Sequence, residues 1–160
     1  MEIHVTVNDV PLTFAVEPNE TLLRVLRREG FYSVKDGCDD GTCGVCAVIL
    51  DGRLVNSCIL LAAQADGKRI TTIEGLGARG RLDPLQAAFV DAGAVQCGYC
   101  TPARILAAKA LLDENPHPTE LDVREALSGV LCRCTGHVKP VEAVMRVVNG
   151  SGEVGDAQSL

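Results

Sequence analysis

The chain has 160 residues, a formal net charge of −6 and 47% hydrophobic residues. This is enough apolar material for one large domain or two small ones. Aromatic residues make up 3% of the chain and tryptophan is absent, so the core must be mainly aliphatic. The acidic balance and the lack of clustered Lys and Arg argue against a nucleic-acid partner.

Nothing in the sequence marks the protein for export or for a membrane. Residues 1–5 have the pattern of a strand, without the charged and apolar regions of a signal peptide and without a twin arginine. No apolar run approaches the roughly 18 residues that cross a bilayer, so we expect no membrane insertion. We therefore expect a cytoplasmic protein. Because thiols stay reduced in that compartment, the eight cysteines predict metal or cluster ligation rather than disulfides.

The first half of the chain predicts a small mixed sheet covered by a helix. Apolar and polar residues alternate over 3–7 and 12–16, and Asn8-Asp9 between them offers a tight turn, so we expect a β-hairpin. A helical pattern opens at Glu20-Thr21. A second hairpin is expected over 47–50 and 54–55, and a last strand over 69–73. This combination predicts an α+β domain over residues 1–76.

The second half predicts helices. Three glycines between residues 75 and 80 indicate an irregular connection, and we place a linker at residues 77–81. Four helices of about ten residues then predict a compact bundle over residues 82–149. Their start signals are Asp83-Pro84, Thr101-Pro102, Thr119 with Asp122, and Pro140. Residues 150–160 are rich in Ser, Gly, Glu and Asp, which predicts a disordered tail.

The first half carries four cysteines in a C-x4-C-x2-C…C pattern: Cys38, Cys43, Cys46 and Cys58. This spacing is typical of plant-type [2Fe–2S] ferredoxins, whose two irons need four converging thiolates. Glycines between the cysteines allow the backbone to wrap around a cluster and to direct N–H groups at sulfur. A structural Zn(Cys)4 site is the alternative, although zinc sites usually pair two C-x2-C knuckles.

The second half carries a C-x2-C pair, Cys97 and Cys100, and a C-x-C pair, Cys132 and Cys134. Each pair precedes a predicted helix start, where the partial positive charge of the helix favours thiolates and an anionic cluster. A second iron–sulfur cluster is the main hypothesis from the spacing. A zinc site remains open, because zinc knuckles and thioredoxin-like motifs share the C-x2-C pair.

The residues around these cysteines resemble one family. The segments 96–102 (QCGYCTP) and 131–136 (LCRCTG) are similar to the signature of the iron–sulfur subunit of the molybdenum hydroxylases, the xanthine oxidase family. The segment 37–46 resembles that family's ferredoxin loop, and Asn115-Pro116 and Ser128-Gly129 also fit. The similarity covers roughly residues 2 to 149.

The resemblance implies a β-grasp, ferredoxin-like domain followed by a four-helix bundle. It implies two [2Fe–2S] clusters, an outer one on Cys38, Cys43, Cys46 and Cys58 and an inner one on Cys97, Cys100, Cys132 and Cys134. It further implies a large partner subunit with a molybdopterin cofactor, which Gln96 would approach, and FAD on another subunit or another acceptor. Electrons would pass from molybdenum through both clusters, in an enzyme acting on an N-heterocycle such as a purine or on an aldehyde.

The sequence departs from the family pattern beside the second cysteine set. Ala103-Arg104 stands where Gly-Met is common, and His137 where Tyr is common. Neither change removes a ligand. Arg104 and His137 lie close in sequence to the second cysteine set, so they would alter the potential of its cluster or the surface that meets the partner. Two other functions compete with this one, a freestanding ferredoxin and a zinc-bound interaction module without a redox role.

Overall fold

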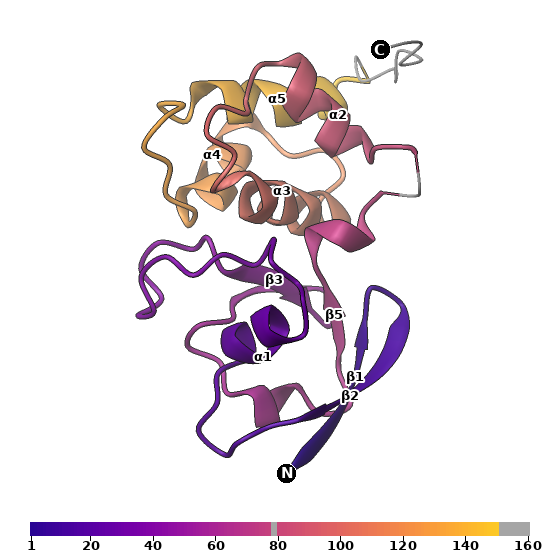
Figure 1. Ribbon diagram of the computed structural model, residues 1–160. Coiled ribbons are helices and arrows are strands. Elements are labelled where there is room, and N and C mark those ends of the chain that lie inside the picture. Colours follow the sequence, from indigo (N-terminus) through magenta and orange to yellow (C-terminus); the bar gives the residue numbers. More distant parts are fainter. Residues whose placement is uncertain (78–79, 151–160) are drawn as a thin grey trace.

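The computed structural model describes residues 1–77 and 80–150 and shows two parts, one built on a sheet and one of helices (Figure 1). The chain starts with a hairpin of β1 (Glu2–Val7) and β2 (Val10–Ala15). Asn8 and Asp9 both have positive φ, 51° and 65°, in the two-residue turn between these strands. Such a turn suits the right-handed twist of a hairpin, and Asn and Asp tolerate it. The predicted hairpin is confirmed.

Five strands form one mixed sheet in the order β2-β1-β5-β3-β4. A second hairpin joins β3 (Ala47–Leu50) to β4 (Arg53–Asn56), and β5 (Arg69–Thr71) runs parallel to β1 and antiparallel to β3. Helix α1 (Leu22–Arg28) and the 3-10 helix η1 (Ala62–Ala65) pack with the sheet around one aliphatic core. Ile3, Leu22, Val25, Leu26 and Val48 are fully buried in it.

The second part begins after the 3-10 helix η2 (Ile73–Gly75) and contains α2 (Pro84–Asp91), α3 (Thr101–Glu114), α4 (Glu120–Ser128) and α5 (Val138–Val148). The capping signals explain two of these starts. Asp83 accepts a hydrogen bond from the backbone N–H of Leu85, and Thr119 accepts one from that of Asp122. The division at residues 77–81 stays a prediction. Residues 78–79, and the predicted tail beyond Gly150, lie outside the described residues.

Two predicted helix starts are shifted. Helix α3 takes Cys100 rather than Thr101 as its N-cap, and the Cys100 side chain makes no capping hydrogen bond. Helix α5 begins at Val138, two residues before Pro140, because His137 reverses the chain in a left-handed conformation with φ 66°. Pro140 fits the first turn of α5, where the N–H groups have no intrahelical acceptor.

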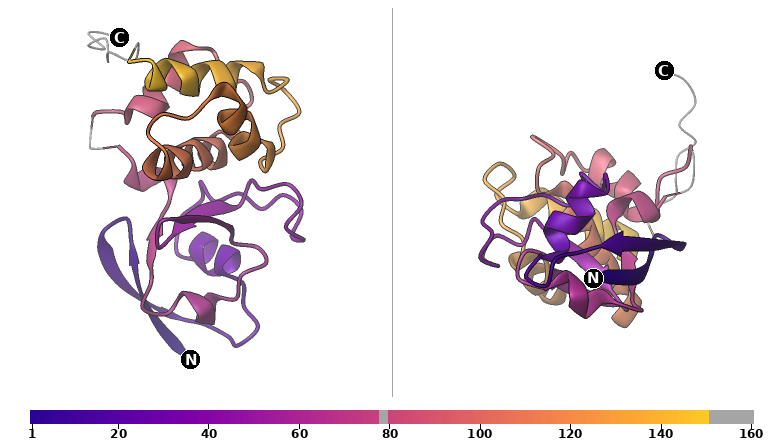
Figure 2. Two further views of the ribbon diagram at one scale, coloured as in Figure 1. Left: turned by 180° about the vertical axis from the view of Figure 1, so that it is seen from behind. Right: turned by 60° about the horizontal axis from the view of Figure 1, so that its bottom comes forward.

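The two parts are in contact along the face where the cysteine-bearing loops lie. Figures 1 and 2 show α3 lying across the end of the sheet part, next to β3. Val45 and Ala47, from the end of the first cysteine loop and the start of β3, are buried in the aliphatic core of the helices. The loop that carries Cys43 and Cys46 therefore connects one core to the other.

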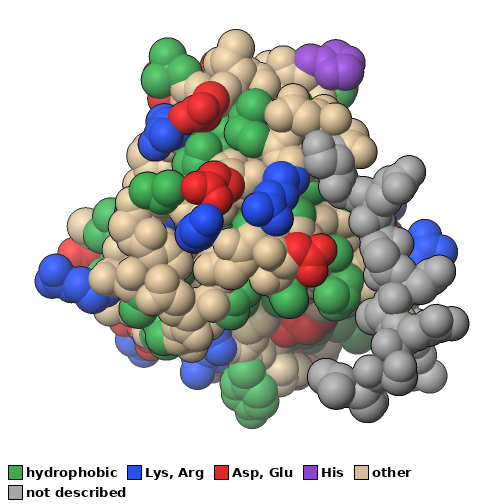
Figure 3. All heavy atoms as spheres, turned by 90° about the horizontal axis from the view of Figure 1, so that it is seen from above, with side chains coloured by type: hydrophobic (Ala, Val, Ile, Leu, Met, Phe, Trp, Pro, Cys, Tyr) green, Lys and Arg blue, Asp and Glu red, His purple; other side chains and the backbone are tan. Residues whose placement is uncertain are grey.

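On the face at the helical end, charged side chains of both signs are mixed (Figure 3). Seen from the helical end, acidic and basic side chains alternate with apolar ones (Figure 3). Most ion pairs, such as Arg124–Glu120, join exposed side chains and contribute little stability each. In the part of the chain that the structure describes, no helix has the length and apolarity to cross a membrane.

Candidate iron–sulfur sites

Three of the first four cysteines lie in the long loop between α1 and β3, and Cys58 lies in the segment after β4. Cys38 and Cys43 are partly exposed, whereas Cys46 and Cys58 are buried. The backbone N–H of Cys43 donates to the sulfur of Cys38 over 3.4 Å. Cys58 in turn contacts Cys46, and the charges of both Cys38 and Cys46 act on its thiol. The Cys43 thiol also interacts with the Cys38 thiol, so the four sulfurs form two neighbouring pairs.

Backbone geometry allows this convergence. Gly41 and Gly44 have positive φ, 85° and 72°, so the loop turns sharply between the cysteines. The buried Ser57 hydroxyl donates to the carbonyl oxygen of Cys46 over 2.7 Å and fixes the start of β3 to the segment that carries Cys58. Nothing in the sequence pointed to this structural role of Ser57.

Acidic residues border the first loop at the surface. Asp40 accepts a hydrogen bond from the backbone N–H of Thr42 over 2.9 Å. The neighbouring Cys38 thiol and Thr42 hold the pKa of Asp40 down, at about 2. Asp36, Asp39 and Asp40 are all exposed to solvent.

The second four cysteines lie on two loops of the helical part. Cys97 and Cys100 occupy the turn from α2 into α3, and Cys132 and Cys134 occupy the loop between α4 and α5. Cys100 interacts with Cys132, and Cys134 interacts with Cys97. Again four sulfurs form two pairs, here with each pair drawn from both loops. Cys100 is buried, while Cys97 and Cys134 are exposed.

Local hydrogen bonds prepare one sulfur of this set as a thiolate. The backbone N–H of Thr135 lies 3.4 Å from the Cys132 sulfur, and the Thr135 hydroxyl lies 3.1 Å from it. Burial acts to raise the pKa of Cys132, but these hydrogen bonds outweigh it and lower the pKa to about 7. The sequence analysis gave Thr135 no role of its own, because its bond to Cys132 is visible only in the structure.

Two buried thiols, those of Cys58 and Cys100, are poor acids without a bound cation. Burial raises the pKa of Cys58 to about 12, with Cys46 adding to the effect. Burial also raises the pKa of Cys100 to about 11, against the opposing influence of Arg104. Metal ions bind thiolates, so iron binding here would release protons and would stabilise the folded loops at the same time.

The paired arrangement fits a two-iron cluster. Within residues 1–77 and 80–150, no three His, Cys, Asp or Glu side chains are grouped as ligands of a single metal ion. A structural zinc site requires four ligands around one ion, whereas a [2Fe–2S] cluster takes two thiolates on each of two irons. Both cysteine sets supply two pairs of sulfurs, so their donor chemistry fits clusters of this kind.

The two cysteine loops touch each other directly. The backbone N–H of Leu131, next to Cys132, donates to the carbonyl oxygen of Cys43 over 2.9 Å. A Cβ atom added at Gly44 would lie 1.9 Å from the carbonyl oxygen of Gly129, so the two backbones are packed as closely as glycine permits. No sequence signal pointed to this contact, because it joins residues more than 80 positions apart.

Tyr99 forms a second link between the sets. Its hydroxyl donates to the carbonyl oxygen of Asp36, two residues before Cys38, and the Lys35 ammonium lies 6.0 Å from the centre of its ring. Tyr99 remains 46% exposed, so a bound partner could cover it. Arg133, between Cys132 and Cys134, has an exposed side chain. Gln96 is also exposed and directly precedes Cys97.

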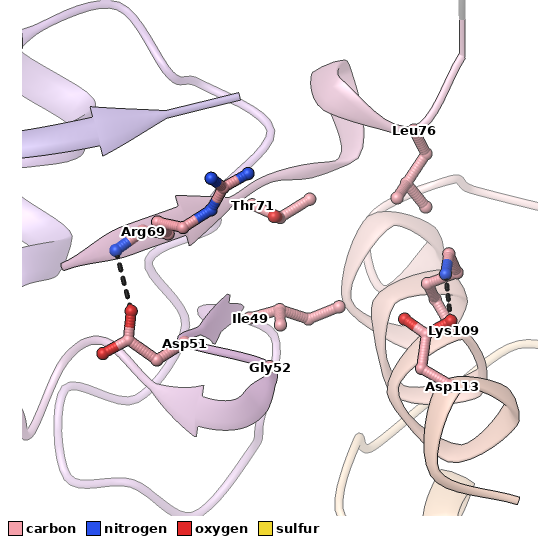
Figure 4. A pocket seen from close by; sticks show the side chains of 8 residues that line it. All are labelled: Ile49, Asp51, Gly52, Arg69, Thr71, Leu76, Lys109 and Asp113. Atoms are coloured by element: carbon pink, nitrogen blue, oxygen red, sulfur yellow. Dashed lines mark hydrogen bonds and ion pairs between the residues drawn. The ribbon is translucent and has the colours of Figure 1, made fainter. Parts of the chain in front are cut away.

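Among the surface hollows, one lies beside the second cysteine set and another has no cysteine in its lining. The first is a mainly apolar depression lined by Cys97, Tyr99, Cys100, Leu131, Cys132, Arg133 and Cys134. The second lies between the sheet and α3, where the Lys109–Asp113 ion pair faces Arg69 and Asp51 (Figure 4). No cysteine lines this second hollow, so we assign it to packing between the two parts.

Comparison with known proteins agrees with the two sets. A family model described as "2Fe-2S iron-sulfur cluster binding domain" matches residues 5–72, and one described as "[2Fe-2S] binding domain" matches residues 72–145. The chain is 50% identical over 147 residues to the nicotinate dehydrogenase small FeS subunit of Eubacterium barkeri, covering 91% of this chain and 94% of that one. It is 44% identical to the xanthine dehydrogenase iron-sulfur-binding subunit of Escherichia coli O157:H7, over 89% and 91% of the two chains.

This chain belongs to the iron–sulfur subunits of the molybdenum hydroxylase family. It is an electron-transfer subunit of an oxidoreductase, as the resemblance predicted. The structure of quinoline 2-oxidoreductase from Pseudomonas putida 86 superposes with a TM-score of 0.90 at 41% identity, over 97% of both chains.

Some family members carry the same unit within a longer chain. The aldehyde oxidoreductase of Desulfovibrio desulfuricans superposes with a TM-score of 0.88 at 44% identity over 93% of this chain, but the match covers 17% of that longer one. In that protein the iron–sulfur unit is therefore a small part of one long chain.

Proposed function

We propose that Cys38, Cys43, Cys46 and Cys58 hold an outer [2Fe–2S] cluster and that a second set holds an inner one. The second set consists of Cys97, Cys100, Cys132 and Cys134. The observation that carries the proposal is the arrangement of each set as two pairs of sulfurs, joined by direct contact of the two loops. Each cluster, when bound, accepts and releases one electron. The fold that presents them would be a β-grasp domain followed by a four-helix bundle, with the boundary at residues 77–81.

The surface around the second set supports its assignment as the inner site. Cys97 and Cys134 are exposed, and Tyr99 and Leu131 beside them are 46% and 51% exposed. Apolar side chains of this size at the surface are typical of an interface. A large partner subunit with the molybdopterin cofactor would cover this surface, and Gln96, which is exposed, would approach the pterin.

The contact between the loops supports a route from the inner to the outer site. From Cys132, one peptide unit leads to the N–H of Leu131, which donates to the carbonyl oxygen of Cys43. The route from ligand to ligand thus consists of covalent bonds and one hydrogen bond of 2.9 Å. The outer site would then deliver electrons to FAD on a further subunit, or to another acceptor.

We infer that the substrate is an N-heterocycle. The chain is 50% identical to a subunit of nicotinate dehydrogenase and 46% identical to a subunit of nicotine 6-hydroxylase, and quinoline 2-oxidoreductase shares its fold closely. Aldehydes are the second candidate, because an aldehyde oxidoreductase matches with 45% identity.

The eight free cysteines support a cytoplasmic location, where thiols stay reduced.

The deciding experiment is to measure metal content and subunit composition of the complex purified from its native host. We expect about four irons per chain, two [2Fe–2S] electron paramagnetic resonance (EPR) signals, molybdenum and a larger co-purifying subunit. Bleaching by nicotinate or quinoline, but not by benzaldehyde, would support the heterocycle. Iron without molybdenum or a partner would favour a freestanding ferredoxin, and zinc in place of iron would refute the redox function.

A further inference from the structure

Arg104 is a buried cation whose surroundings do not balance its charge. Its side chain is 1% exposed, and it is one of the largest fully buried side chains in the structure. No carboxylate among the described residues pairs with it, and its Nε and Nη1 atoms have no hydrogen-bond acceptor there. A buried guanidinium in this situation is costly unless an anion lies close to it.

The contacts of Arg104 place it beside two ligands of the second set. Arg104 follows Cys100 by one turn of α3, and its positive charge acts to lower the pKa of the Cys100 thiol. Its Nη2 atom donates to the carbonyl oxygen of Val130 over 2.7 Å, two residues before Cys132. The same nitrogen lies 2.6 Å from Nδ1 of His137, on the far side of the C-x-C loop.

These contacts hold the guanidinium in one position. The carbonyl oxygen of Val130 and the imidazole of His137 both engage Nη2, so the side chain is fixed between α3 and the loop from α4 to α5. Neither neighbour supplies negative charge. Nε and Nη1 remain as two donors without an acceptor among the described residues, in a side chain whose charge acts on the Cys100 sulfur.

We propose that Arg104 sets the reduction potential of the inner cluster. This inference rests on the proposed function, because it requires a cluster on Cys97, Cys100, Cys132 and Cys134. A [2Fe–2S] cluster on four thiolates is anionic, and one-electron reduction adds one further negative charge. A fixed, buried positive charge stabilises the reduced form more than the oxidised form, so Arg104 raises the potential and favours electron arrival at the inner cluster.

The test is an EPR-monitored redox titration of the complex from the native host, with Arg104→Met or Arg104→Gln in place of the native residue. The inner signal is identified as the one that survives in Cys43→Ser. We expect reduction of the inner cluster to become at least tenfold less favourable, a fall of about 59 mV for one electron. Arg104→Lys should retain most of the native potential, and the outer cluster should be unchanged.

Arg124→Met is the matched control, because it removes the same charge from the exposed face of α4. An unchanged inner potential in Arg104→Met or Arg104→Gln, with both signals present, would overturn the proposal. An equal shift in Arg124→Met would overturn it too. Loss of the inner cluster from both neutral variants, but not from Arg104→Lys, would also overturn it. Arg104 would then be needed to assemble the cluster rather than to set its reduction potential. A native complex without iron would instead refute the proposed function itself.

Discussion

The close approach of the two cysteine loops makes Gly44 a sensitive position. In Gly44→Ala, the new methyl group would lie 1.9 Å from the carbonyl oxygen of Gly129 and 3.1 Å from the Cα of Val130. Both are backbone atoms, so no flexible side chain can move away. The alanine would also have to adopt φ near 72°, a left-handed conformation.

The two penalties can be estimated separately. A left-handed conformation costs an L-residue about 1–2 kcal/mol. Overpacking by one methyl group costs about 1–3 kcal/mol. Gly44→Ala should therefore lower the free energy of unfolding by about 2–5 kcal/mol.

Gly52→Ala is the control that isolates the contact between the loops. Gly52 has φ 83° in the turn from β3 to β4, but an added Cβ would meet nothing within 4 Å. This variant should lose only the conformational part, about 1–2 kcal/mol. For a chain of this size each kcal/mol corresponds to about 2–4 °C in Tm.

The assay is thermal unfolding of the cluster-loaded protein, followed by circular dichroism and by the visible absorbance of the clusters. We expect Gly44→Ala to unfold several degrees below Gly52→Ala. Equal Tm values for the two variants would refute the conclusion that the two loops are packed backbone against backbone.

Three further predictions concern the clusters and the helical part. Cys43→Ser should remove or alter one EPR signal and leave the other, because each cysteine set lies in its own part of the fold. Loss of both signals would show that the two clusters assemble together. Gln96→Ala should keep both clusters but slow their reduction by substrate in stopped-flow measurements, and unchanged kinetics would remove Gln96 from the electron route. Asp83→Ala should lower the free energy of unfolding by about 1 kcal/mol, because Asp83 caps α2 through the N–H of Leu85 over 2.9 Å. Asp91→Ala, at the exposed end of the same helix, should leave Tm unchanged, and an equal fall in both would contradict the capping role.

Local features of the fold were predictable because they depend on residues close together in the sequence. The turn at Asn8-Asp9 and the caps at Asp83 and Thr119 are formed by neighbouring residues, and all three are present. The start of α5 was wrong by two residues. There the left-handed conformation of His137 directly precedes the helix, and a non-glycine residue adopts that conformation too rarely for the sequence alone to predict it.

The cysteine sets were predictable for a similar reason. Three of the first four cysteines lie within nine residues, and the second four form two short pairs, so the spacing itself indicates the chemistry. How the sulfurs pair was not readable from the spacing. In the second set each pair joins two loops, and the fold of the helices decides which sulfurs meet.

The sequence by itself determined the elements, the two cysteine sets and the family. The tertiary structure decided how the two sets meet, through the hydrogen bond from Leu131 to Cys43 and the packing of Gly44 on Gly129. It also decided that Arg104 is buried without a carboxylate among the described residues. The physical reason is the separation along the sequence of the residues that interact. Cysteine spacing and helix capping depend on residues a few positions apart. Burial and contacts between loops depend on distant segments that only the folded chain brings together.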